Sequence, residues 1–137
     1  NVKILLVVIL IVATFFRLWQ LGEVPAGLHE DEAAYGYNAF ALLQTGRDEH
    51  GEFFPLVLKS FGEYKPALYA YLTIPWVAIF DLTPFAVRLT SALFGIFSVI
   101  ACYFLAKKLF ANEKIALLSS LILALSPWHI TLSRTTS

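Results

Sequence analysis

Residues 89–106 of this 137-residue chain read LTSALFGIFSVIACYFLA, eighteen consecutive positions without a charged side chain. A run of this length is typical of a helix that crosses the hydrocarbon core of a bilayer, which takes about 20 apolar residues. Residues 115–132 are a second run of this kind. Residues 4–16 form a third, which lengthens to about 20 residues if Lys3 and Arg17 extend their charges toward the interfaces. We therefore expect three membrane-spanning helices, over residues 2–21, 89–106 and 115–132.

The composition points to the same class of protein. The chain is 58% hydrophobic and 15% charged, whereas a soluble domain has about 25% charged residues. The formal net charge is zero, which gives no electrostatic footprint for nucleic acid. A single cysteine, Cys102, excludes a disulfide framework. We expect an all-α integral membrane protein and, because no methionine is present and the last residues stop within a pattern, the N-terminal fragment of a longer chain.

Segment 66–80 is apolar but has 15 residues and two prolines, a length more typical of an interfacial or re-entrant segment than of a span. If it does not cross, Lys3 and the lysine cluster at 107–114 share one side of the membrane, as the positive-inside rule prefers. This arrangement places the N-terminus in the cytoplasm and residues 22–88 in an extracytoplasmic loop. Pro127 is expected to kink the third span.

Within this loop, residues 29–35 read HEDEAAY and precede a helical pattern over 32–45 that Gly46 would end. One face of that helix is expected to carry Ala33, Tyr37, Phe40, Ala41 and Gln44. Asp31 and Glu32 would then lie at its N-terminus, where the macrodipole favours ionised carboxylates. A capping Asp followed by a first-turn Glu is the simple alternative.

The chain also resembles a known family through an ordered set of motifs. The motifs are LHEDEAAY (28–35), TGRDEHG (45–51), EYKPALY (63–69), FAVRL (85–89), SPWH (126–129) and Ser133-Arg134. Together they resemble the N-terminal part of a family 39-type glycosyltransferase of the GT-C superfamily, whose relatives include protein O-mannosyltransferases and lipid A aminoarabinose transferases. Two positions depart from the family pattern: Ala67 replaces a second proline, and Glu30 precedes Asp31.

The resemblance implies GT-C-type transmembrane helices with a helical extracytoplasmic first loop. It also implies transfer of a hexosyl or pentosyl group from a polyprenyl-phosphate sugar donor to a protein, lipid or glycan hydroxyl. In such families the acidic pair, here Asp31 and Glu32, is the active-site signature, and the lysine, here Lys65, lies near the lipid phosphate. A membrane lipid is the further partner, and a bacterial or archaeal plasma membrane is the expected location.

The residue types suit that chemistry. A carboxylate can accept the proton of the acceptor hydroxyl, and cations can stabilise the departing phosphate. We therefore take Asp31 and Glu32 as candidate catalytic residues and Lys65, Arg88 and Arg134 as candidate donor-phosphate ligands. The cofactor is undefined; a divalent metal is one candidate, with Asp31, Glu63 and His29 as candidate ligands.

Simpler interpretations exist for these residues. Lys65, Arg88 and Arg134 could be anchors at helix ends. Glu63 could pair with Lys65 and His29 could be an ordinary loop histidine. At the level of function, the alternatives are a transporter or flippase module for a lipid-linked substrate and a non-catalytic membrane scaffold. The spans lack ionisable residues between their ends, which disfavours the transporter.

The expected topology leads to a first prediction. Cysteines introduced at Lys108 and Ser60 of the full-length protein should react with a membrane-impermeant thiol reagent from opposite sides, because one span separates these positions. Labelling of both from the same side would contradict the three-span arrangement.

Overall fold

The computed structural model describes residues 1–60 and 62–136, and these residues are mostly helical. They form two compact units. The bundle unit contains Asn1–Trp19 and Ser91–Thr135, and the loop unit contains Gln20–Thr90 together with Thr136. Helix α4 (Pro84–Phe110) begins in the loop unit and continues into the bundle unit.

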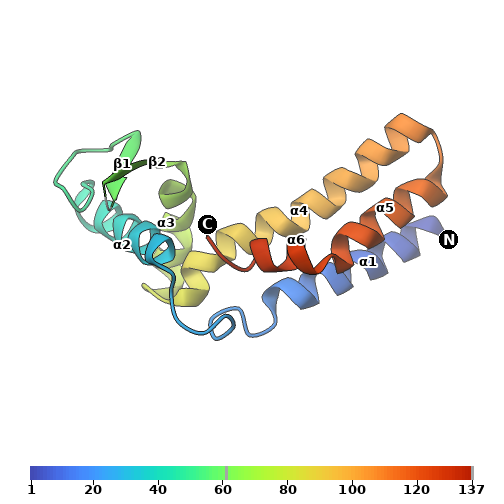
Figure 1. Cartoon of the computed structure of the whole chain (residues 1–137), viewed down its shortest axis with the longest axis horizontal. Helices are drawn as coiled ribbons and strands as arrows, with labels where there is room; N and C mark the ends of the chain where they lie inside the picture. The colour runs from blue at the N-terminus through green and yellow to red at the C-terminus, as the bar shows by residue number, and fades with distance from the viewer. Residues whose placement is uncertain (61, 137) are drawn as a thin grey trace. The chain divides into compact units, whose positions relative to one another are not determined.

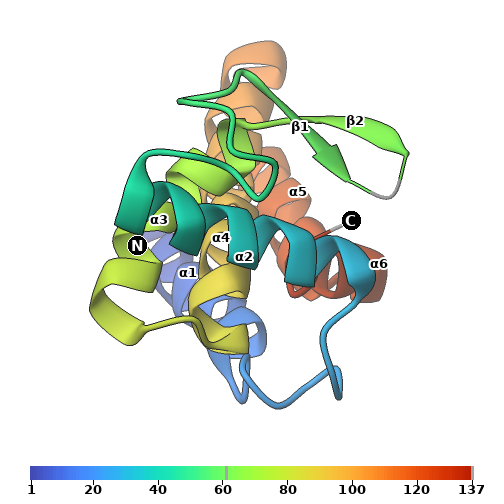
Figure 2. The same cartoon turned by 90° about the vertical axis from the view of Figure 1, so that its left-hand side faces the viewer.

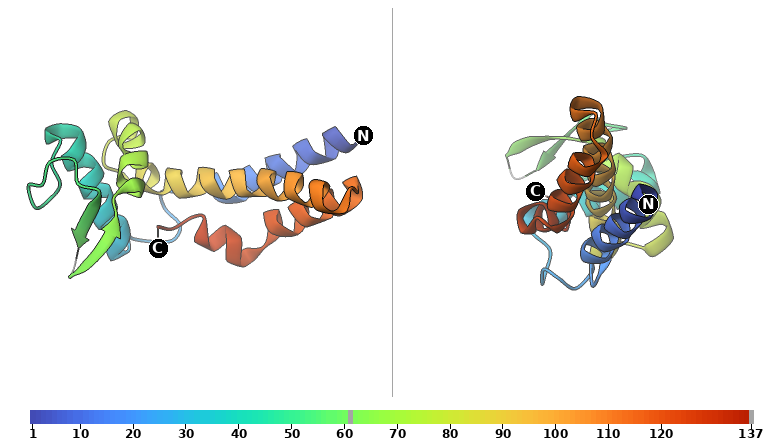
Figure 3. Two further views of the ribbon diagram at one scale, coloured as in Figure 1. Left: turned by 90° about the horizontal axis from the view of Figure 1, so that it is seen from above. Right: turned by 90° about the vertical axis from the view of Figure 1, so that its right-hand side faces the viewer.

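In the bundle unit, α1 (Val2–Leu18) and α5 (Glu113–Leu125) lie beside the later part of α4 (Figures 1 and 3). Helices α1 and α5 run in the same direction, and α4 runs in the opposite one. Ala13, Val99 and Ala124 are fully buried where the three helices meet. Small residues at such contacts let helix backbones approach closely, which is how helices associate without a strong hydrophobic driving force.

The third expected span is broken rather than kinked. Helix α5 ends at Leu125, Ser126 is extended, and α6 (Pro127–Leu132) begins with the proline. Proline lacks a backbone N–H and disfavours helical geometry in the residue before it, so Ser126 leaves the helix. The side chain of Ser126 then caps α6 by accepting a hydrogen bond from the backbone N–H of His129.

Among the described residues, α4, with 27 residues, is the one helix that is long and apolar enough to cross a membrane. Helix α1 has 17 residues, so it ends three positions before the expected boundary at residue 21. The arrangement with three spans stays a prediction.

In the loop unit, α2 (Glu30–Thr45) packs against α3 (Leu68–Phe80), and strands β1 (Val57–Ser60) and β2 (Glu63–Pro66) form a hairpin (Figure 2). Helix α2 begins two residues before the expected start, and Gly46 ends it with a φ of 68°. On the expected face, Ala33, Tyr37 and Gln44 are exposed, whereas Phe40 and Ala41 are partly buried. The buried face of α2 carries Glu32, Gly36, Asn38, Ala39 and Leu42.

The core of the loop unit explains how α2 and α3 come together. Ala39 and Leu42 of α2 meet Ala70 and Val77 of α3, with Leu58 of the hairpin beside them. Helix α3 occupies most of the expected segment 66–80 and carries Pro75 inside it. The hairpin that precedes it has no counterpart among the sequence-based expectations, and it is the element that carries Lys65.

Candidate functional site

The first turn of α2 holds two neighbouring carboxylates in different surroundings. His29 is the N-cap residue with extended backbone, and Glu30, Asp31 and Glu32 form the first turn. Negative charge at this end of a helix is favoured by the unpaired N–H groups and the macrodipole. The Asp31 side chain is 33% exposed, whereas that of Glu32 is 1% exposed.

Hydrogen-bond donors surround the buried carboxylate of Glu32. Arg88 donates from Nε to Oε1 and from Nη2 to Oε2, both at 2.9 Å. The backbone N–H of His29 donates to Oε2 at 3.1 Å and that of Thr136 to Oε1 at 3.3 Å. Burial acts to raise the pKa of Glu32, but the hydrogen bonds and charge of Arg88 outweigh it and the net pKa is lowered. Glu32 therefore stays ionised and is fixed in place.

Arg88 is also fully buried, and its hydrogen bonds account for its whole guanidinium. Besides its two bonds to Glu32, Nη1 donates to the carbonyls of Leu21 at 3.1 Å and Pro25 at 2.9 Å. Nη2 also donates to the carbonyl of Gly27 at 2.5 Å. A guanidinium has five N–H groups, and all five are engaged. This differs from the expected role of Arg88 in phosphate binding: the geometry makes it the residue that ties segment 21–27 to α2 and α4.

The second carboxylate, Asp31, forms an ion pair with Lys65 of strand β2. This hydrogen bond raises the pKa of Lys65, so the ammonium stays charged. The Lys65 side chain is 14% exposed, so the pair can be reached from solvent. Tyr35 lies one helical turn after Asp31, and burial raises the pKa of its phenol, which is therefore neutral beside the pair. The ring of Tyr35 contacts that of Tyr69 with centroids 5.0 Å apart.

The metal-ligand candidates do not gather into a site. Glu63 is exposed on β2, two residues before Lys65, and its charge helps to raise the pKa of that lysine. His29 serves as the N-cap residue of α2. Within residues 1–60 and 62–136, no group of three His, Cys, Asp or Glu side chains could hold a metal ion. The role of Asp31, Glu63 or His29 toward a divalent metal stays a prediction.

Arg134, the third predicted phosphate ligand, belongs to the bundle unit. Its Nη1 donates to the carbonyl of Phe16 at 2.7 Å. Its role toward a donor phosphate stays a prediction. The structure brings Asp31, Glu32, Lys65 and Arg88 together in the loop unit.

The motif at 45–51 proves to be a folded turn attached to α2. Asn38 is buried and donates from Nδ2 to Glu49 at 3.2 Å, while its Oδ1 accepts from the Glu49 backbone N–H at 3.1 Å. Asp48 accepts hydrogen bonds from the backbone N–H groups of His50 and Glu52. The sequence signal for this turn is Asp48, since an Asp side chain readily accepts a hydrogen bond from the backbone N–H two residues later.

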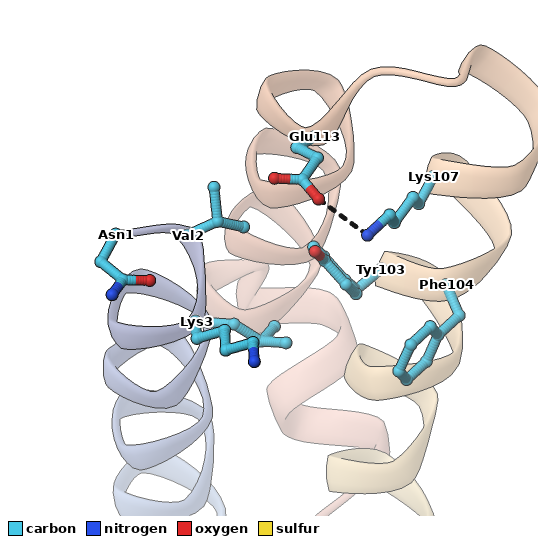
Figure 4. Close-up of a pocket in the computed structure, with 8 residues that line it drawn as sticks. Asn1, Val2, Lys3, Tyr103, Phe104, Lys107 and Glu113 are labelled. Carbon is cyan, nitrogen blue, oxygen red and sulfur yellow. Dashed lines mark hydrogen bonds and ion pairs between the residues drawn. The ribbon is translucent and has the colours of Figure 1, made fainter.

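Cavities occur among the described residues of both units. One, of about 240 Å³, is mostly apolar and opens beside Glu32; its walls include Leu28, Tyr37 and Leu82. The other, of about 450 Å³, lies in the bundle unit between the start of α1 and the end of α4 (Figure 4). Lys107 and Glu113 form an ion pair at its edge with 2.7 Å between Nζ and Oε1. No predicted site residue lines the second cavity.

The buried pair of Glu32 and Arg88 generates a stability prediction. Replacing Arg88 by Leu should cost about 3–5 kcal/mol in the free energy of unfolding, because it leaves a buried carboxylate without its counter-ion. The double variant Glu32→Gln/Arg88→Leu should lose less than the sum of the single variants. Arg47→Leu, at an exposed arginine, is the control and should cost under about 1 kcal/mol.

The same pair predicts the response to acid. The folded-state pKa of Glu32 is lowered, so its contribution to stability is complete above the ordinary carboxyl pKa of about 4.3 and is lost as the pH falls through the lower folded value. Thermal unfolding of the full-length protein between pH 6 and pH 3 should therefore show a steep acid limb that is shallower in Glu32→Gln. Identical limbs would contradict an ionised, paired Glu32.

Comparisons with known proteins give one positive finding. The family described as dolichyl-phosphate-mannose-protein mannosyltransferase matches residues 6–137 of the chain. The matched range contains Asp31, Glu32, Lys65, Arg88 and Arg134. Searches of curated proteins and of solved structures found no match.

Proposed function

The chain belongs to the dolichyl-phosphate-mannose-protein mannosyltransferase family and is a membrane glycosyltransferase, and we propose that it uses a polyprenyl-phosphate-linked sugar as its donor. The acceptor is a hydroxyl of a protein, lipid or glycan, and the transfer takes place on the extracytoplasmic face of the membrane. A bacterial or archaeal plasma membrane is the proposed location. The acidic residues, cations and apolar surfaces of the loop unit support this proposal.

The observation that carries the proposal is the different environment of the two adjacent carboxylates. Glu32 is buried and accepts four hydrogen bonds from Arg88, His29 and Thr136, so it cannot reach a substrate without losing them. Asp31 is partly exposed and pairs with one lysine. Neighbouring acids whose environments differ in this way commonly take separate roles in acid–base catalysis. We assign the catalytic base to Asp31 and a positioning role to Glu32.

In the proposed reaction, the oxygen of the acceptor hydroxyl attacks the anomeric carbon of the donor sugar. The bond between that carbon and the phosphate oxygen breaks, and its electron pair leaves with the polyprenyl phosphate. Asp31 takes the proton of the acceptor hydroxyl, which makes the oxygen a better nucleophile as the new bond forms. Glu32 and Arg88 hold the first turn of α2 in the geometry that this proton transfer requires.

Lys65 is the proposed ligand of the donor phosphate. The pKa of Lys65 is raised, so it carries a full positive charge, and it forms an ion pair with Asp31, the proposed base. A cation there stabilises the negative charge that develops on the leaving phosphate. Arg134 is the second proposed phosphate ligand. Arg88 is not proposed as a phosphate ligand, because its five N–H groups are engaged within the loop unit.

The polyprenyl chain requires an apolar surface close to the phosphate site. Helix α3 begins two residues after Pro66 and leaves four large apolar side chains exposed, those of Leu68, Leu72, Ile79 and Phe80. The apolar cavity beside Glu32 adds a second surface of this kind in the same unit. Both surfaces fit a long hydrocarbon chain better than a soluble nucleotide-sugar donor.

The catalytic assignment predicts that Asp31→Asn lowers sugar transfer by about 10²–10⁴-fold, the usual contribution of a general base. The measurement is transfer of radiolabelled sugar from a polyprenyl-phosphate donor by the full-length protein in membranes. Glu30→Gln is the matched control, because Glu30 lies in the same turn, is exposed and should be dispensable. Wild-type rates in Asp31→Asn would overturn the assignment.

The phosphate assignment predicts that Lys65→Ala weakens donor binding by about 10- to 100-fold, the range for loss of a hydrogen bond to a charged group. Acceptor KM should change little, because the lysine contacts the leaving group. Lys59→Ala removes an exposed lysine from the other strand of the same hairpin and should leave donor binding intact. Equal effects of the two substitutions would show that the lysine at 65 has no particular role.

A further inference from the structure

A second buried arginine lies in the bundle unit, where the proposed chemistry makes no use of it. The Arg17 side chain is 0% exposed, although the sequence suggests a charge that extends to the interface. Its Nη1 donates to the carbonyls of Ala13 at 3.1 Å and Ala124 at 3.2 Å, and its Nη2 to that of Leu123 at 3.4 Å. A buried cation in an apolar bundle is costly unless such partners hold it.

The carbonyls that Arg17 contacts on α5 are those whose regular helical bonds are lost at the helix break; that of Leu123 keeps one long bond, of 3.4 Å, from the Ser126 N–H. In a continuous helix, the carbonyl of Leu123 would accept from the N–H of residue 127 and that of Ala124 from the N–H of residue 128. Residue 127 is proline, which has no N–H, and Ser126 departs from helical geometry. These two carbonyls also lie at the negative end of the α5 macrodipole, where a cation is favoured.

Histidine 129 extends the network to α4. Arg17 Nη2 lies 2.7 Å from His129 Nδ1, and His129 Nε2 lies 2.9 Å from Ser98 Oγ. A guanidinium only donates hydrogen bonds, so Nδ1 must be the bare nitrogen of a neutral imidazole and Nε2 must carry the proton. His129 therefore donates to Ser98, whose hydroxyl donates to the carbonyl of Gly95 at 2.8 Å.

The same contacts fix the segment that carries Arg134. A Cβ at Gly95 would come within 2.3 Å of the Ser133 Cβ, so this glycine is required for the close approach of α4 and the end of α6. Arg134 follows directly and donates to the carbonyl of Phe16, the residue before Arg17. Segment 126–134 is thus held by α1 on one side and by α4 on the other.

We propose that Arg17 is a C-terminal cap that α1 supplies to the broken end of α5, and that Arg17 and His129 are positioning residues for Arg134. The second half of this inference rests on the proposed function of Arg134 as a phosphate ligand. The first half is independent of it, because it concerns only the carbonyls of Leu123 and Ala124 and the proline that removes their regular helical bonds.

A double-mutant cycle in the full-length protein tests the cap. Arg17→Leu should lower the melting temperature. Pro127→Ala restores an N–H that can bond the Leu123 carbonyl, so part of the need for Arg17 disappears. The double variant should therefore lose less than the sum of the single losses, by about 2–4 °C. Arg47→Leu combined with Pro127→Ala is the control and should be additive.

Additivity of Arg17→Leu and Pro127→Ala would overturn the cap. If Arg17→Leu does not fold, Arg17→Gln replaces it in the cycle, because the glutamine amide can still donate to one carbonyl and should show a smaller coupling of the same sign. The tautomer of His129 gives a second readout. It is measured by nitrogen NMR of the protein with ring-labelled histidine, and the His129 signal is assigned by its loss in His129→Leu. A proton on Nε2 alone is expected, and a proton on Nδ1 would contradict the network.

The positioning role needs a kinetic readout. His129→Leu should raise the KM for the polyprenyl-phosphate sugar while kcat stays near its wild-type value, because the phosphate ligand is displaced but the base is intact. His129→Asn keeps an acceptor oxygen near the position of Nδ1 and should restore part of the donor KM. An equal loss of kcat in both variants would reject positioning. Absence of transfer by the wild-type protein would reject the proposed function, with the stability cycle unaffected.

Discussion

The bidentate pair between Glu32 and Arg88 is the interaction on which the loop unit depends. Two buried charges of opposite sign meet at 2.9 Å, and the arginine uses its other N–H groups on three carbonyls of segment 21–27. Removing such charges from water costs several kcal/mol per ion, and the geometry must offset that cost. The full set of hydrogen bonds does so here, and it fixes the start of α2 against α4 and the preceding segment.

The pair of Glu32 and Arg88 gives the two neighbouring carboxylates, Asp31 and Glu32, different surroundings. A carboxylate that holds a buried arginine is well suited to fix a helix and poorly suited to accept a proton from a substrate. Its neighbour Asp31 sits one position earlier on the same turn and faces an accessible lysine instead. The fixed Glu32 therefore holds the turn from which Asp31 reaches solvent, so the proposed base is positioned without being buried itself.

The sequence predicted the elements that depend on local signals. The apolar run at 89–106, the helix that Gly46 ends and the helical nature of most of segment 66–80 all follow from periodicity and terminators, and the structure has helices there. The partner expected for Lys65 was Glu63, two residues away, whereas the structure pairs Lys65 with Asp31 of α2, a contact between elements distant in the chain. Local signals do not reveal that Arg88 donates hydrogen bonds to backbone carbonyls 61 to 67 residues away, because these contacts depend on tertiary folding.

The buried polar face of α2 escapes sequence-based prediction for the same reason. Glu32 and Asn38 are buried because they are hydrogen-bonded, and hydrophobic periodicity does not register such residues. Pro127 predicts a kink, whereas the structure has a full break. Two side chains compensate for it: Arg17, distant in the chain, donates to the Ala124 carbonyl, and Ser126 caps α6.

The ion pair of Asp31 and Lys65 has a consequence for the order of events during turnover. While Asp31 and Lys65 are paired, the carboxylate of the proposed base is bound to an ammonium and the proposed phosphate ligand is bound to a carboxylate. Neither is then free for its proposed role. In the proposed reaction, an incoming donor phosphate would compete for Lys65, and Asp31 would then become available to the acceptor hydroxyl. The enzyme would in this way remain chemically inert until its donor has arrived, and water reaching the empty site would meet no activated base. In the proposed reaction, a single exchange of partners on Lys65 would thus couple donor binding to the availability of the proposed base.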